Sequence, residues 1–172
     1  KFLYDLGLVP TSEPYAKRTA QGLILGPDGD KMSKSKGNVV DPNDVVDVYG
    51  ADVLRAYVLF MGDYEQAAPW NESSMKGCKR FLDRVWELHN MLVEGDEYRD
   101  ELMSSMHKTI KKVSNDIESM KFNTAIASMM TLLNEISAVG TLTVDELKVF
   151  LKLLCPFAPH IAEELWEALG HK

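Results

Sequence analysis

The feature that most constrains the fold is a run of amphipathic helical patterns in the second half of the chain. In the segments 74–92, 101–120 and 122–139, apolar side chains recur every three or four residues. This spacing places the apolar side chains on one face of a helix, so each segment needs a partner against which to bury that face. The segments 143–154 and 159–169 repeat the pattern. Four or five such helices with short connections predict an antiparallel helical bundle.

Local signals set the ends of these helices. Gly140 follows the third pattern and is typical of a helix C-terminus. Thr143 and Glu146 have the spacing of a capping box, which predicts the start of the fourth helix. Pro156 is expected to stop that helix, and Pro159 to start the fifth.

The first part of the chain has a different organisation. We expect residues 1–10 to be the end of a helix and residues 18–25 to form a strand, followed by a Gly/Asp-rich turn. Asp41 is expected to cap a helix that runs to about Tyr49. A second short helix should cover residues 51–61, with Leu54, Tyr57, Val58 and Met61 on one side.

The fold class predicted from these patterns is mainly α: an antiparallel bundle preceded by a strand–loop–helix remnant of an α/β domain. The division falls near residue 62, so that 1–62 and 63–172 form the two parts.

Composition narrows the class of protein further. The 172 residues are 45% apolar and 26% charged, as in globular rather than disordered chains. No apolar run approaches the roughly 18 residues of a membrane span, and no secretory signal opens the chain. Cys78 and Cys155 have no zinc-site spacing, so we expect reduced, buried thiols and a cytoplasmic location. A net charge of −7 argues against indiscriminate binding of nucleic acid, although a local basic face is compatible with it.

The pentapeptide 31–35 carries the strongest chemical signal. It places two ammonium groups and two hydroxyls within five residues. Lysines are long, flexible point charges that can reach phosphate oxygens, and the following Gly37 allows the backbone to turn closely. A solvated charged turn is the alternative interpretation of so short a motif.

The sequence of this pentapeptide, KMSKS, resembles the signature loop of the class I aminoacyl-tRNA synthetases, and it stands after a strand and before a helix, as in that family. The stretch KMSKSKGNVVDPNDVVDVYGADVLRAYVLF is similar to what these enzymes share after the signature. GDYEQAAPWNESSMKGCKRFLDRVWEL and HKTIKKVSNDIESMKFNTAIASMMTLLNE resemble the leucyl branch. CPFAPHIAEELWEALG resembles a bundle helix common to the leucyl, isoleucyl and valyl enzymes. The likeness covers essentially the whole chain.

The resemblance implies an assignment for each part of the chain. Residues 1–62 would be the end of a Rossmann-like catalytic domain with the loop and its connecting helices. Residues 63–172 would be a helical tRNA-binding bundle of the anticodon-binding type, incomplete at its C-terminus.

The resemblance also implies roles in a leucine–tRNA ligase that uses ATP, with Mg²⁺ accompanying the ATP. Lys34 would be the main contact to the ATP phosphates and Lys31 would assist it. Ser33 and Ser35 would hold the loop or donate to ATP, and Met32 would anchor the loop, with its backbone near the adenine. Catalysis would then be electrostatic, through position and charge.

One element of the family is missing from this sequence. The His-x-Gly-His signature of class I enzymes does not occur in it, and the chain begins with Lys1 rather than Met. We therefore expect an excised part of a longer enzyme, inactive alone and with no bound cofactor or metal.

Two groups of basic residues are candidate contacts for tRNA(Leu). The first comprises Lys76, Lys79, Arg80 and Arg84, and the second comprises Lys108, Lys111, Lys112 and Lys121. Solvated helix surface is the plainer interpretation of such charge runs. The family implies contacts to the tRNA backbone, which are independent of sequence and sensitive to salt.

Other aromatic and imidazole groups are expected to be structural. We expect Trp70, Trp86 and Trp166 to pack in the core or at an interface, and His160 to have a structural or capping role.

Three alternatives to the leucyl assignment remain open at this point. The chain could be the same part of an isoleucyl or valyl enzyme, a tRNA-binding paralogue without catalysis, or a helical bundle whose loop is accidental. An open edge at residues 18–25 also predicts self-association of the chain.

Overall fold

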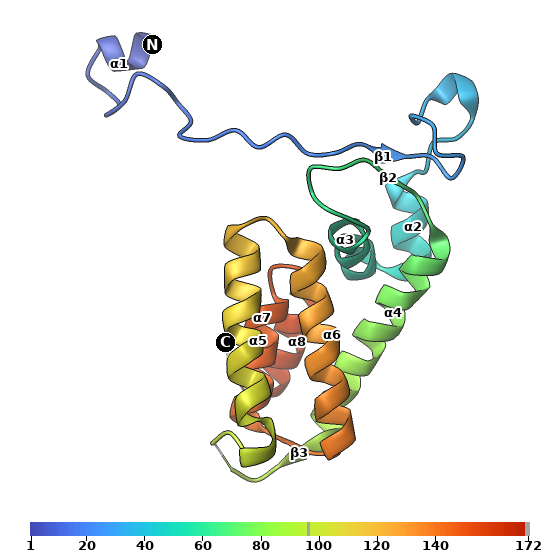
Figure 1. The fold of residues 1–172 in the computed structure, drawn as a ribbon, viewed down its shortest axis with the longest axis vertical. Coiled ribbons are helices and arrows are strands. Elements are labelled where there is room, and N and C mark those ends of the chain that lie inside the picture. Colours follow the sequence, from blue (N-terminus) through green and yellow to red (C-terminus); the bar gives the residue numbers. More distant parts are fainter. Residues whose placement is uncertain (96, 171–172) are drawn as a thin grey trace.

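Helices dominate the computed structural model, which describes residues 1–95 and 97–170. The bundle is built from α4 (Glu72–Trp86), α5 (Asp100–Glu118), α6 (Phe122–Val139), α7 (Val144–Leu154) and α8 (Pro159–Ala168). In Figure 1, α5 and α6 stand side by side and run in opposite directions, α7 and α8 lie behind them, and α4 descends along the α6 side. The mainly α, antiparallel bundle is as expected.

The helix ends lie where the local signals place them. Gly140 ends α6 in the left-handed region, with φ of 83°. The backbone N–H of Glu146 donates to Thr143 Oγ1 at 3.3 Å, and Thr143 N–H donates to Glu146 Oε2 at 2.8 Å, so the capping box is confirmed. Glu146 is fully buried, and it also accepts the backbone N–H of Arg99 at 2.9 Å. The cap of α7 therefore also fixes the entry to α5.

A continuous apolar core runs through the bundle. Among its fully buried members are Met75, Leu88, Leu102, Met106, Ile126, Met129, Leu133, Ile136, Phe150 and Phe157. Burial raises the pKa of the Cys78 thiol in this core to about 11, so it stays protonated and unreactive at neutral pH. Cys155 is only partly buried, and both cysteines are free.

Short elements close one end of the bundle. The 3₁₀ helix η2 (Glu87–Met91) continues α4, and it leads to β3 (Leu92–Val93). This strand pairs in parallel with β4 (Leu142–Thr143), directly before α7. In the described part of the chain, no helix combines the length and the apolar character needed to cross a membrane.

The N-terminal segment contains less regular structure than the sequence predicts. Helix α1 (Phe2–Asp5) has four residues and ends well before Pro10. The strand expected over 18–25 is confined to β1 (Ile24–Leu25), because only this part pairs with β2 (Ala68–Pro69). The rest of the segment runs out along the top of the molecule in Figure 1.

Helices α2 (Pro42–Tyr49) and α3 (Ala51–Phe60) connect the loop to the bundle. Asp41 caps α2 as expected, since its carboxylate accepts the Asn43 N–H at 2.8 Å. The face assigned to α3 is partly wrong: Val58 is 36% exposed, whereas Val53 and Ala56 are buried. Tyr57 is buried as expected, and the Tyr57 ring stacks edge-on against Trp70, with centroids 4.9 Å apart.

Candidate functional site

The pentapeptide Lys31–Ser35 lies between β1 and α2, at the end of the molecule opposite β3 (Figure 1). A single 3₁₀ turn, η1 (Lys34–Lys36), forms its second half. Gly37 ends this turn with φ of 68°, a left-handed conformation that favours glycine. The loop thus projects from the strand and returns directly to the capped start of α2.

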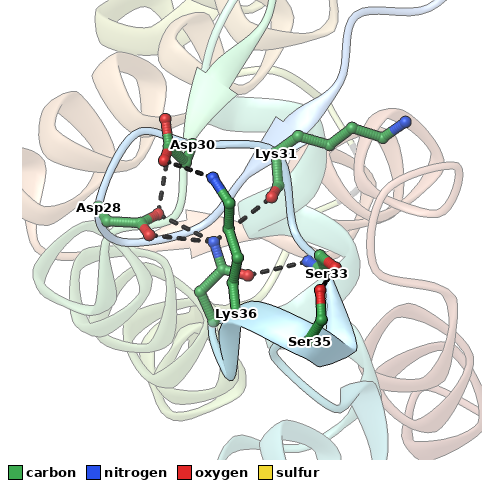
Figure 2. Close-up of polar contacts among 7 residues, drawn as sticks. Asp28, Asp30, Lys31, Ser33, Ser35 and Lys36 are labelled. Atoms are coloured by element: carbon green, nitrogen blue, oxygen red, sulfur yellow. Dashed lines mark hydrogen bonds and ion pairs between the residues drawn. The ribbon is translucent and has the colours of Figure 1, made fainter.

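Asn38 is the centre of the hydrogen bonds that hold this loop. Its side-chain oxygen accepts the Ser33 N–H at 2.8 Å, and its amide nitrogen donates to both carboxylate oxygens of Asp28, at 3.1 and 3.0 Å. A side chain at Gly26 would displace this pair, because a Cβ there would lie 2.7 Å from Asp28 Oδ1 and 2.9 Å from Asn38 Nδ2. The turn and the loop are therefore one hydrogen-bonded unit (Figure 2).

Asp30 and Lys36 add an ion pair to the same unit, with Nζ and Oδ2 2.7 Å apart. The N–H of Asp30 donates to Asp28 Oδ1 at 3.1 Å. This backbone hydrogen bond, together with the side-chain hydrogen bond from Asn38, holds the pKa of the Asp28 carboxyl below its ordinary value of 3.8. Both acids of the turn thus have partners within the unit.

The other two lysines of the loop differ from Lys36. Lys31 and Lys34 are exposed, and neither makes an ion pair with any residue that the structure describes. In Figure 2 the Lys31 side chain extends away from the Asp28 and Asp30 carboxylates. The arrangement leaves two ammonium groups available to an anion from outside the chain.

The remaining members of the pentapeptide have short-range contacts. The hydroxyls of Ser33 and Ser35 lie 2.8 Å apart and form one hydrogen bond. Met32 is half-buried and packs against the core. Flexible cations, hydroxyl donors and an apolar anchor on one braced loop can bind a polyphosphate.

Sequence reasoning missed Gly26, Asp28 and Asn38 as the residues that hold the loop. The sequence patterns indicated a turn at 26–30 and a charged pentapeptide, but no contact between them. The available signal was the tolerance of Asn and Asp for turns and for side-chain-to-backbone hydrogen bonds. Their pairing across ten residues is a tertiary feature, which no local pattern gives.

Three of the eight basic residues singled out on the helices already have intramolecular partners. Arg84 donates to Asn134 Oδ1 at 2.8 Å and to Ser137 Oγ at 3.0 Å, both on α6. Lys79 pairs with Asp83 on its own helix at 2.7 Å.

Lys112 is the third, and its half-exposed ammonium group belongs to a small network around the buried Asp116 carboxylate. It pairs with Asp116, which also accepts the Thr124 hydroxyl at 2.6 Å. Burial alone would raise the pKa of Asp116, but the hydrogen bonds from Lys112 and Thr124 outweigh it and lower that pKa below 3.8. Lys112 thus helps to fix the turn between α5 and α6.

The other five basic residues are exposed and have no ion pair among the described residues: Lys76, Arg80, Lys108, Lys111 and Lys121. They come from separate elements: Lys76 and Arg80 lie on α4, Lys108 and Lys111 on α5, and Lys121 at the start of α6, which stands between α4 and α5 (Figure 1). A shallow depression of about 240 Å³ between α5 and α6 is lined by Lys108, Lys112, four hydroxyl-bearing residues and one acid, Glu135. Such a surface offers donors to a phosphate backbone.

The tryptophans differ in their burial. Trp70 is buried as expected, whereas Trp86 is 41% exposed and does not belong to the core of this chain. Trp166 is partly buried, with the ammonium of Lys152 5.4 Å from its ring centroid. His160 has the structural role expected, since its Nδ1 lies 2.8 Å from Asp52 Oδ1.

Two parts of the chain match families of known proteins. Residues 7–71 match the family described as tRNA synthetases class I (I, L, M and V), and residues 100–172 match the anticodon-binding domain of tRNA ligase. The leucine–tRNA ligase of Alkaliphilus oremlandii is 56% identical over 99% of this chain. The chain belongs to the class I tRNA synthetases.

Other relatives of this synthetase chain give the same picture. The leucine–tRNA ligase of Chlorobium chlorochromatii is 49% identical over 99% of the chain. The chain spans only about a fifth of the curated relatives it matches, 21% and 22% of these two.

Solved synthetases share the fold. The structure of the ternary complex of Agrobacterium radiobacter K84 agnB2 LeuRS-tRNA-LeuAMS matches 97% of this chain and 24% of its own chain, with a TM-score of 0.84 and 34% identity. The methionyl-tRNA synthetase of Mycobacterium tuberculosis in complex with methionyl-adenylate matches 89% of this chain and 38% of its own, with a TM-score of 0.68. At 17% identity, the second likeness concerns the fold alone.

Proposed function

We propose that the chain is part of a leucine–tRNA ligase, which activates leucine with ATP and transfers it to tRNA(Leu). Within that enzyme, residues 1–62 supply the end of the catalytic domain with the ATP-phosphate-binding loop, and residues 63–172 supply the tRNA-contacting bundle. Residues 96 and 171–172 of this range lie outside the described residues. The observation that carries the proposal is a braced loop with two lysines outside any described ion pair, in a chain 56% identical to a leucine–tRNA ligase.

The chemistry of the loop supports an ATP site. When a carboxylate attacks the α-phosphorus of ATP, negative charge builds up on the departing phosphates. The Lys34 and Lys31 ammonium groups stabilise that charge, with Lys34 as the main contact and the serine hydroxyls of 33 and 35 as further donors. At the base of the loop, Asp30 is paired with Lys36 and Asp28 is bonded to Asn38. These acids therefore do not compete with the ATP phosphates for the two lysines.

Magnesium enters with the nucleotide in this proposal. In the described part of the chain, no three or more His, Cys, Asp or Glu side chains are grouped to hold a metal ion. The Asp28 and Asp30 carboxylates near the loop already have partners. The ATP phosphates themselves are the natural ligands of Mg²⁺ here, as in other sites where substrate phosphates supply its oxygens.

Five exposed basic residues on the helices are proposed to contact the backbone of tRNA(Leu). The main candidates are Lys108, which lines the depression between α5 and α6, and Lys111, which follows it on α5; Lys76, Arg80 and Lys121 are further candidates. Arg84, Lys79 and Lys112 are proposed to hold the helices rather than to contact tRNA directly, because their charges are engaged within the chain. Contacts of this type depend on salt and read the shape of the RNA.

Two further proposals concern where the protein works and with what partner. A cytoplasmic location follows from the role in translation and from the free cysteines. Self-association is proposed only for the exposed segment before β1, because Leu25 is paired with Pro69 on one side and bridged to Lys31 on the other. Light scattering at increasing concentration tests this, and a monomer at the highest concentration would contradict it.

The function is tested with the full-length protein that carries this chain. Leucine should support ATP–pyrophosphate exchange and the charging of tRNA(Leu), with an advantage over valine on the order of 100-fold, as expected for small apolar differences between substrates. If isoleucine or valine supported exchange as well as leucine does, the chain would instead be assigned to the isoleucyl or valyl enzymes. Binding of tRNA without exchange for any amino acid would favour a paralogue without catalytic activity.

A further inference from the structure

We infer that Asp52 is a positioning residue, which couples the helical bundle to the Lys31–Ser35 loop; the inference rests on the proposed function. Asp52 lies in the first turn of α3, and α2 connects the loop to α3 through Gly50. Its side chain is only 12% exposed. A carboxylate so little exposed needs strong partners, and all of those described come from the far end of the sequence.

The partners of Asp52 are at the start of α8. Its carboxylate accepts the backbone N–H of Ile161 at 2.7 Å and that of His160 at 3.3 Å, and His160 Nδ1 lies 2.8 Å from Oδ1. Ala158, at the N-cap of α8, makes no side-chain capping bond. Asp52 therefore caps α8 from another helix, and its negative charge is well placed at that helix N-terminus.

Arg55 makes a second tie one turn further along α3. Its guanidinium donates to the carbonyl oxygen of Pro156 at 3.1 Å, in the connection between α7 and α8. The two ties join residues 101 to 109 positions apart in the sequence. Together they fix the direction of α3 against the bundle by polar contacts, which need a defined geometry that apolar packing alone does not impose.

The other end of α3 is held as well. The Tyr57 hydroxyl accepts the N–H of Asn71, at the N-cap of α4, at 2.7 Å. Helix α3 is thus fixed to α4 and α8 at once, and its N-terminal end carries α2 and the loop. A displacement of α8 within the bundle would be transmitted through Asp52 to α3, and from there through α2 to the loop.

The experiment compares Asp52→Ala, Asp52→Asn and His160→Ala in the full-length protein. Positioning predicts that Asp52→Ala lowers kcat/KM for ATP in leucine-dependent exchange by on the order of tenfold to a hundredfold. The KM for leucine should stay unchanged, because the loop acts on the nucleotide. Asp52→Asn keeps one acceptor for α8 and should recover part of the activity. His160→Ala keeps both backbone hydrogen bonds and should have little effect.

The readouts separate this inference from the proposed function. If wild-type protein shows no leucine-dependent exchange, the proposed function fails, and the inference fails with it. If the wild type is active and Asp52→Ala keeps its kcat/KM for ATP while its Tm falls, Asp52 is a helix cap only and the inference is overturned. If Asp52→Ala does not fold, Asp52→Asn decides: an unchanged kcat/KM for ATP overturns the inference, and a selective decrease for ATP supports it.

Discussion

The side-chain amide of Asn38 joins Asp28, in the turn before the pentapeptide, to Ser33 within it. Its nitrogen donates to both carboxylate oxygens of Asp28, and its oxygen accepts the N–H of Ser33. Through this one residue the turn before the pentapeptide and the pentapeptide itself form a single unit. The lysines proposed to contact ATP project from this unit. A rigid unit lowers the entropic cost of ordering the loop when the nucleotide binds.

Replacing Asn38 by alanine should therefore weaken ATP use without touching a proposed ATP contact. We expect KM for ATP in leucine-dependent exchange to rise on the order of tenfold, because the loop must then be ordered at the cost of binding energy. Steady-state kinetics of the full-length protein measure this. The matched control is Asn43→Ala, the same change at a position where only the backbone N–H is used. Equal KM values for the two variants would count against a role of Asn38.

The Asp116 network predicts a stability effect with a defined pH dependence. Asp116→Asn should lower the free energy of unfolding at pH 7 by about 1–3 kcal/mol, because a buried, charge-assisted set of hydrogen bonds is weakened. Since folding lowers the pKa of Asp116, this stabilisation is complete above its ordinary value of 3.8 and disappears as pH falls through the lower folded value.

Urea denaturation of the 172-residue chain and its variants measures that difference at pH 7 and again below pH 3.8. Glu118→Gln is the control, an acid-to-amide change at an exposed position of the same helix. The gap between wild type and Asp116→Asn should narrow in acid. A gap that stays constant with pH would mean that the Asp116 charge contributes nothing to stability.

The proposed tRNA surface predicts a change in salt dependence. The double variant Lys108→Ala/Lys111→Ala should bind tRNA(Leu) more weakly, and the slope of log K against log salt should fall by about 1 for each phosphate that the variant no longer neutralises. Filter binding at several salt concentrations measures both quantities. Lys79→Ala/Lys148→Ala is the control, because these lysines pair with Asp83 and Asp145. Equal slopes in the two double variants would leave Lys108 and Lys111 as solvated surface.

The parts of the fold that follow local rules could be predicted from the sequence. The end of α6 at Gly140, the capping box of Thr143 and the cap at Asp41 each depend on residues a few positions apart. The five bundle helices follow from apolar spacing for the same reason. Local rules also place the pentapeptide between a strand and a helix.

The errors come from partners distant in sequence. The strand over 18–25 shrinks to Ile24–Leu25 because β2 offers only two residues to pair with. The prediction for α3 was partly wrong because Ala56, and not Val58, turns towards the core. Arg84 finds its acceptors 50 and 53 residues away on α6, so its charge could not be assigned from its own helix. Periodicity gives an apolar stripe, but tertiary packing selects which part of it is buried.

The most direct test of the central claim, that this loop grips the phosphates of ATP, compares Lys34→Ala with Lys36→Ala in the full-length protein. Both remove one lysine from the same 3₁₀ turn, but Lys36 is paired with Asp30 and Lys34 makes no ion pair with a described residue. We predict that Lys34→Ala lowers kcat for leucine-dependent ATP–pyrophosphate exchange about 100-fold to 1,000-fold, as for removal of one preorganised donor, and that Lys36→Ala causes a much smaller decrease. Equal decreases in the two variants, or an active Lys34→Ala enzyme, would contradict the claim.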